Sequence, residues 1–114
     1  MTKKERQHLD RVTGLGCIAC LYMGYEDTPA GIHHLREGMG MGMRSSHWCS
    51  IPLCPGHHQY QEAGKIAFHR ASKQFERAYD TEENFLRQVY EILRSRYPKE
   101  YTSVDEKTID FNPE

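Results

Sequence analysis

Apolar residues recur at helical spacing through the second half of the chain. The first set predicts a helix; it consists of Phe68, Ala71, Phe75 and Tyr79. A second helix is expected to begin with Asp80 or Thr81 as its N-cap and Glu83 in its first turn. It ends at Pro98, and its apolar face consists of Phe85, Leu86, Val89, Leu93 and Tyr97. Both faces indicate core packing, and together they predict helices over about 67–97.

The first half of the chain has no helical period beyond its N-terminus. Residues 3–12 are charged and are expected to form a short helix that ends near Gly14 and Gly16. Residues 14–56 are rich in Gly, Cys, His and Met, which favours loops and short strands. The predicted strands are 31–35 and 49–53.

The pattern of the sequence changes at Pro55. A proline is tolerated at the start of a helix, so a helix can begin just after it. A short helix is therefore expected from His57 to about Gly64. Two short strands and several helices predict a small α+β domain over residues 1–99. The last segment, 100–114, is expected to be a loosely held acidic tail whose removal after Tyr97 leaves stability nearly unchanged.

The composition is that of a small folded domain. The chain has 114 residues, of which 38% are hydrophobic, so we expect a modest core that is helped by a staple. It has no apolar run of even ten residues and begins with the charged stretch MTKKERQHLD, which predicts neither a membrane span nor a secretory signal. We therefore expect a cytoplasmic protein, in which four cysteines are free or metal-bound rather than paired as disulfides.

The charge distribution is more informative than the net charge of −1. The segment 100–114 contains five acidic residues and one basic residue, Lys107. The remaining residues, 1–99, therefore hold 14 basic and 11 acidic side chains, a net charge of +3. A mildly basic body permits phosphate contacts but does not require them.

The cysteines form two half-sites with the spacing of metal ligands. Cys17 and Cys20 make a C-x2-C pair, and Cys54 and His57 make a C-x2-H pair 34 residues after Cys20. Together they supply four sulfur and nitrogen ligands, the set that a tetrahedral structural Zn²⁺ requires. The fourth cysteine, Cys49, is interpreted as an ordinary buried thiol.

A redox motif or unliganded thiols are the alternatives to zinc. A redox C-x2-C is expected to open a helix after a buried strand, and the stretch GLGCIACLYMG does not have that form. Zinc is therefore the favoured interpretation.

The order of the histidines resembles that of the HNH nucleases. A His-His pair lies on the first predicted strand, a polar residue lies by the second, and a further histidine lies on the following helix. The closest resemblance is to the phage recombination-enhancement nucleases (Ref-like), which depend on RecA filaments. It rests on C-x2-C, HHL, IPLCPGHH and AFHRASKQFERAY within residues 17–79. The resemblance implies a zinc-stapled ββα-metal (HNH or treble-clef-like) core over about 14–70, followed by two C-terminal helices.

The same resemblance implies roles for individual histidines. His33 matches the first metal ligand, and His34 matches the general base. His58 matches the metal ligand on the helix, and His69 lies where relatives carry a further ligand. Many HNH proteins instead use a residue one turn after the helix histidine, which here is Glu62.

The middle position departs from the HNH pattern. Nine residues before His58 the chain has Cys49 and not Asn. His47 is the nearest residue of suitable chemistry and is favoured for this role, which stays open between the two.

The resemblance implies a metal-dependent DNA endonuclease. A neutral imidazole can take a proton from water near neutral pH, and a divalent cation would neutralise the leaving oxygen. Imidazole ligands suit Mn²⁺, Zn²⁺ or Ni²⁺ better than Mg²⁺, although Mg²⁺ can also serve. A RecA-type filament that presents the DNA is the implied partner. The candidate DNA contacts are Arg36, Arg44, Lys65, Arg70 and Lys73. The alternative is a non-catalytic zinc module that binds nucleic acid or a recombination protein.

Overall fold

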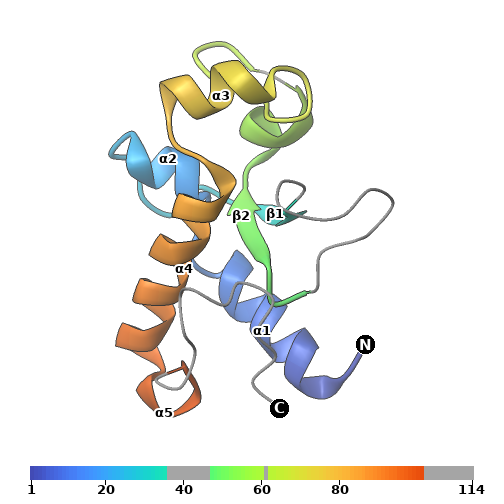
Figure 1. The fold of residues 1–114 in the computed structure, drawn as a ribbon, viewed down its shortest axis with the longest axis vertical. Helices are drawn as coiled ribbons and strands as arrows, with labels where there is room; N and C mark the ends of the chain where they lie inside the picture. The colour runs from blue at the N-terminus through green and yellow to red at the C-terminus, as the bar shows by residue number, and fades with distance from the viewer. Residues whose placement is uncertain (36–46, 61, 102–114) are drawn as a thin grey trace.

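A two-stranded sheet lies between helices from both halves of the chain (Figure 1). The computed structural model describes residues 1–35, 47–60 and 62–101. The first half contains α1 (Lys3–Thr13), α2 (Ile18–Tyr22), β1 (Gly31–His34) and β2 (Ser50–Leu53). The second half contains the π-helical turn η1 (Gly56–Tyr60), α3 (Ser72–Ala78), α4 (Glu82–Arg96) and α5 (Pro98–Tyr101). The predicted α+β class, with two strands and C-terminal helices, is confirmed.

Side-chain caps determine where the longer helices begin. Thr2 caps α1 in a reciprocal arrangement with Glu5, in which each side chain accepts a hydrogen bond from the other's backbone N–H. Thr81 caps α4 by accepting from the Asn84 N–H, and Asp80 supports it by accepting from the Thr81 N–H. Of the two caps predicted for this helix, Thr81 is therefore the N-cap. No helix in the described part of the chain is long and apolar enough to cross a membrane.

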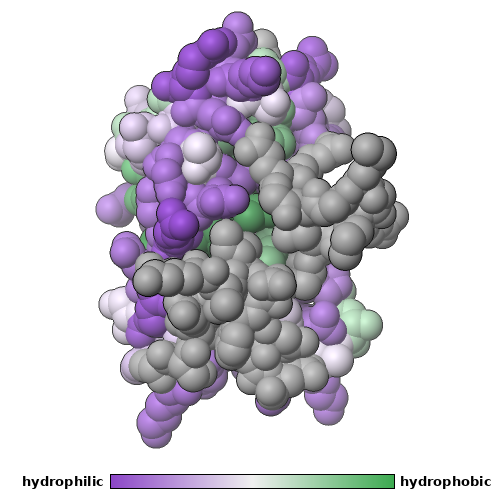
Figure 2. Space-filling model, viewed as in Figure 1, coloured by the Kyte–Doolittle hydropathy of each residue, from purple (hydrophilic) through white to green (hydrophobic). Residues whose placement is uncertain are grey.

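The strands pair antiparallel with His33 opposite Ile51 and His34 opposite Ser50. All four residues of β2 are buried, because α1, α2 and α4 pack against this strand (Figure 1). On the face in Figure 2 the described surface is mainly hydrophilic, as expected when apolar side chains are buried. The largest apolar side chains of the core are Ile18, Ile51, Leu53, Phe75, Phe85, Leu86 and Leu93.

Four elements differ from the sequence prediction. The helix expected from His57 to about Gly64 is the π-helical turn η1, Gly56–Tyr60, and the short helix α5 follows at Pro98. The segment predicted as loop and strand contains α2, which Cys17 caps with its sulfur by accepting from the Cys20 N–H. Helix α3 begins at Ser72 and not near Phe68. The Phe68 N–H donates to the His57 carbonyl, and the His69 N–H donates to the His58 carbonyl. This pairing with η1 competes with helix formation and brings His69 beside His58.

The first residues of the predicted tail are part of the fold. Tyr101 is buried, and its hydroxyl lies 2.8 Å from Nδ1 of His8, which is 93 positions away in the sequence. Burial lowers the pKa of His8 to about 4, so this buried ring is neutral near pH 7. The Arg11 guanidinium lies over the ring of Tyr97. Truncation after Tyr97 would remove the buried ring of Tyr101, so we now expect it to destabilise the domain, while residues 102–114 lie outside the described part of the chain.

Replacing Tyr101 with alanine is expected to destabilise the domain by about 3–5 kcal/mol, the usual loss for a buried aromatic side chain. The change empties a buried volume and removes the hydroxyl that contacts His8. Urea unfolding of the zinc-loaded protein measures the free energy. Tyr25→Ala is the matched control, because Tyr25 is 62% exposed. Equal stabilities of the two variants would contradict the packing of Tyr101.

Candidate metal centres

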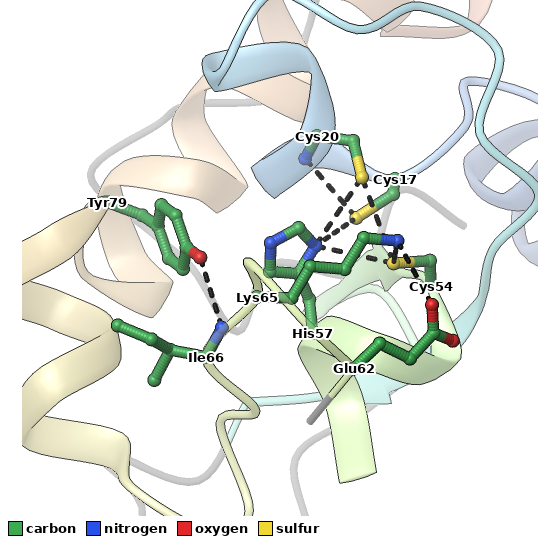
Figure 3. A network of polar contacts seen from close by, with 8 residues as sticks. All are labelled: Cys17, Cys20, Cys54, His57, Glu62, Lys65, Ile66 and Tyr79. Atoms are coloured by element: carbon green, nitrogen blue, oxygen red, sulfur yellow. Dashed lines mark hydrogen bonds and ion pairs between the residues drawn. The ribbon is translucent and has the colours of Figure 1, made fainter. Parts of the chain in front are cut away.

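Three cysteines and one histidine meet in a buried cluster (Figure 3). Cys17 and Cys20 come from the start of α2, while Cys54 follows β2 and His57 lies in η1. Nδ1 of His57 lies 3.5 Å from the sulfur of Cys17, 3.4 Å from that of Cys20 and 3.3 Å from that of Cys54. The sulfurs of Cys20 and Cys54 are 3.8 Å apart.

These separations are close to the distances between neighbouring ligand atoms in a tetrahedral zinc site. Bonds of about 2.3 Å to sulfur and about 2.0–2.1 Å to nitrogen place two sulfurs about 3.8 Å apart and sulfur and nitrogen about 3.6 Å apart. The cluster could therefore hold a structural metal such as zinc, with His57 binding through Nδ1. The structure brings together the four residues that the sequence predicts as ligands.

The environment favours the metal-binding forms of His57 and Cys54, whereas burial raises the pKa of the Cys17 thiol to about 12. Burial lowers the pKa of His57 to about 4, so its imidazole is neutral near pH 7. Although burial opposes it, hydrogen bonds from the His57 backbone, the other thiols and Lys65 lower the pKa of Cys54. Lys65 Nζ donates to the Cys54 sulfur over 3.4 Å and lies 3.8 Å from a Glu62 carboxylate oxygen (Figure 3).

The structure disfavours a redox role for the C-x2-C pair, but not for the reason that the sequence suggested. The C-x2-C pair does open a helix, since Cys17 is the N-cap of α2. It follows α1 and not a strand, and both of its sulfurs face Cys54 and His57. A pair of thiols within a four-ligand cluster is the arrangement of a metal site.

Three further histidines form a second cluster, with ligand nitrogens that all lie within 4.8 Å of one another. His33 is buried on β1, His58 is half-buried on η1, and His69 is exposed in the turn before α3. The Nε2 atoms of His58 and His69 are 2.9 Å apart. Two nitrogens on one ion lie about 2.9–3.4 Å apart when each bond is about 2.0–2.1 Å long. The three side chains could therefore hold a metal ion.

The cluster is buried on one side and exposed on the other. Burial, followed by the neighbouring His33 and His69, lowers the pKa of His58 to about 4. A neutral imidazole is the form that binds a metal. The exposed His69 leaves the cluster accessible from outside the protein.

His34 lies next to His33 in β1, and neighbouring strand residues face opposite sides of a sheet. Its Nε2 lies 3.0 Å from Nδ1 of His47, which precedes β2. Cys49 is buried, and its carbonyl accepts a hydrogen bond from the Leu35 N–H. Of the two residues considered for the middle role, the structure therefore places His47 against His34.

A comparison of the sequence with known protein families identifies the family of this chain. Residues 1–94 match the family described as recombination enhancement, RecA-dependent nuclease. The chain belongs to this family. Among curated proteins no match is found. The matched range includes both clusters, and the family description implies nuclease activity in recombination enhancement. The resemblance to RecA-dependent recombination nucleases is confirmed.

Within this RecA-dependent nuclease domain, the predicted DNA contacts have different surroundings. Lys65 contacts the Cys54 sulfur and so belongs to the surroundings of the cysteine cluster. Arg70 is exposed beside the histidine cluster, where its Nε donates to the Gln59 carbonyl. Lys73 is exposed on α3. The other two candidates, Arg36 and Arg44, lie outside the described residues.

Two acidic residues near the clusters differ in burial and in the side chains that they contact. Glu62 is exposed and lies close to Lys65, and the histidine group among the described residues contains His69 and not Glu62. Glu82 is fully buried in the first turn of α4, and its carboxylate contacts Nε2 of His33. Sequence reasoning missed Glu82, although a signal was present. It lies three, four and seven positions before Phe85, Leu86 and Val89, on the apolar face of the helix.

Proposed function

We propose that the domain is a metal-dependent DNA endonuclease of the HNH type, which cuts DNA presented by a RecA-type filament. The observation that carries this proposal is the convergence of His33, His58 and His69 on one small volume, with a second histidine pair beside it. The family match supports the nuclease activity and the link to RecA. Cys17, Cys20, Cys54 and His57 would bind the structural Zn²⁺.

The histidine cluster would bind the catalytic metal. When bound, a divalent cation supplies positive charge to the scissile phosphate and to the leaving oxygen. Three imidazole ligands suit Mn²⁺, Zn²⁺ or Ni²⁺ better than Mg²⁺. His58 and His69 approach from two segments whose backbones are hydrogen-bonded to each other, which fixes the distance between them.

His34 would act as the general base on the attacking water. When its Nε2–H donates to Nδ1 of His47, the lone pair of His34 is on Nδ1 and accepts the proton from water. His47 would then hold the His34 ring in one tautomer and one orientation, as a third group commonly does for a base. Hydrolysis by this route leaves 5′-phosphate and 3′-hydroxyl ends.

The domain would depend on a partner for DNA affinity. Its formal net charge is −1, and in the described part of the chain the exposed basic residues among the predicted DNA contacts are Arg70, beside the histidine cluster, and Lys73, on α3. Few phosphate contacts give weak, salt-sensitive binding. A RecA filament that holds the DNA would supply the proximity that the domain lacks.

The test is incubation of zinc-loaded protein with single- and double-stranded DNA and several divalent metals, with and without a RecA filament. Cleavage is expected with Mn²⁺ and the filament. His58→Ala is expected to abolish it by weakening the metal site, with partial recovery in excess metal. Gln59→Ala is the matched control, because its side chain is exposed and its backbone contact with Arg70 remains.

The absence of cleavage under every combination, with the cysteine cluster loaded, would overturn the enzyme proposal. It would favour a zinc module that binds nucleic acid or a recombination protein.

A further inference from the structure

Glu82 is a buried carboxylate, and the stability of helix α4 does not explain why it is buried. It is fully buried on the apolar face of α4, where a leucine or methionine would continue the core. Burying a carboxylate is unfavourable unless a partner compensates for the lost hydration. Glu83 provides an acidic side chain in the same first turn without such burial, so the helix dipole does not require Glu82.

Glu82 contacts a residue of the histidine cluster. Its Oε2 contacts Nε2 of His33, across a sequence separation of 49 positions. His33 also packs against Phe68 and lies close to His58 and His69, with ring centroids 5.1 and 5.2 Å away. One end of the His33 imidazole is therefore engaged by the carboxylate, while its ring borders the other two histidines.

The geometry distinguishes a metal ligand from a group that holds a ligand. Among the described residues, the ligand atoms that lie within 4.8 Å of one another belong to the three histidines and not to Glu82. Metal-binding histidines commonly donate their second ring N–H to a carboxylate, which fixes the tautomer and the ring orientation. The contact of Glu82 with one His33 nitrogen matches this outer position.

We propose that Glu82 is a positioning residue for the metal site. It accepts the Nε2–H of His33, holds the ring in one orientation and leaves the lone pair of Nδ1 for the metal. This inference rests on the proposed metal-binding role of the cluster. It also links the site to the core, because the carboxylate is carried by the first turn of α4.

The first test measures metal affinity and not cleavage. Zinc-loaded protein is titrated with Mn²⁺, and free Mn²⁺ is followed by electron paramagnetic resonance. Glu82→Met is expected to weaken Mn²⁺ binding about 10–100-fold, the usual effect of removing such a partner. Glu82→Gln is expected to fall between this variant and the wild type, because its amide oxygen still accepts the N–H but has no charge.

Glu83→Gln is the matched control. It removes one negative charge from the same helical turn, at a residue that is only partly buried, and is expected to bind Mn²⁺ like the wild type. Unchanged Mn²⁺ affinity in folded Glu82→Met would overturn the proposal. Equal losses in the Glu82→Gln and Glu83→Gln variants would also overturn it, because they would indicate a general effect of charge.

The second test reads the His33 tautomer by ¹⁵N NMR in zinc-loaded protein before Mn²⁺ is added. A proton on Nε2 and none on Nδ1 is expected, and any other state would contradict the assignment. This measurement does not depend on the second metal. If wild-type protein binds no Mn²⁺, the metal-dependent function fails, while the tautomer still decides whether Glu82 holds His33.

Discussion

Removal of zinc is expected to unfold the region from residue 14 to residue 60. The four predicted ligands come from two segments 34 positions apart, and the sulfurs of Cys20 and Cys54 lie 3.8 Å apart. A metal site of this kind contributes about 10–16 kcal/mol in zinc-finger peptides. Because small domains have total stabilities of about 5–15 kcal/mol, the fold is expected to depend on the ion. Metal analysis should give one zinc per chain, and circular dichroism in chelator should show lost structure.

Two cysteine substitutions separate metal binding from ordinary core packing. Cys54→Ser is expected to lose zinc and the fold, because it removes one of four ligands. Cys49→Ser is the matched control, since Cys49 is equally buried but lies outside the cluster. It is expected to keep zinc with a modest loss of stability. A zinc-free native protein with full helicity in chelator would refute the prediction.

Loss of zinc should also disperse the second cluster. His57 and His58 are consecutive, and each belongs to a different cluster. The His69 N–H donates to the His58 carbonyl, so the position of His69 depends on the same turn. Chelator-treated protein is therefore expected to lose its Mn²⁺ site together with its zinc.

Replacing His34 with alanine should abolish cleavage without disturbing either metal. A general base contributes rate and little ground-state binding, typically about 10²–10⁴-fold. The variant is therefore expected to keep its fold, its zinc, its Mn²⁺ affinity and its DNA affinity. Single-turnover cleavage at saturating metal, with the filament present, measures the loss.

The response to metal distinguishes His34 from the ligands. Excess Mn²⁺ should partly restore His58→Ala but should leave His34→Ala inactive. Cys49→Ser should cleave like the wild type if His47 and not Cys49 supports the base. Wild-type cleavage by His34→Ala would show that another group takes the proton.

Local sequence patterns predicted much of this arrangement. The two short half-sites identified the cysteine cluster, because C-x2-C and C-x2-H spacings are maintained by a single turn of chain. The periodic apolar positions of α4 and its Thr81 cap were also predicted from the sequence. Helix α2 was missed because cysteine is not a usual N-cap residue, so its capping sulfur gave no signal.

The remaining features depend on distant contacts. The late start of α3 arises because residues 68 and 69 bond to the backbone of η1. The burial of Tyr101 depends on His8, at the other end of the described chain. Glu82 lay visibly on an apolar helix face, but its partner on β1 could be identified only once the two elements were placed together.

The pairing of β1 with β2 has a consequence for how this chemistry can be lost. His33 and His34 are the same amino acid, so their different surroundings come from the side of the strand on which each lies. His33 contacts the buried carboxylate of Glu82, and His34 lies beside His47. A slip of one residue would exchange their surroundings. The register spans four residue pairs and rests on buried positions such as Ile51. If the proposed roles of the two histidines hold, a relative would therefore lose activity through drift in its apolar strand residues while every histidine is retained.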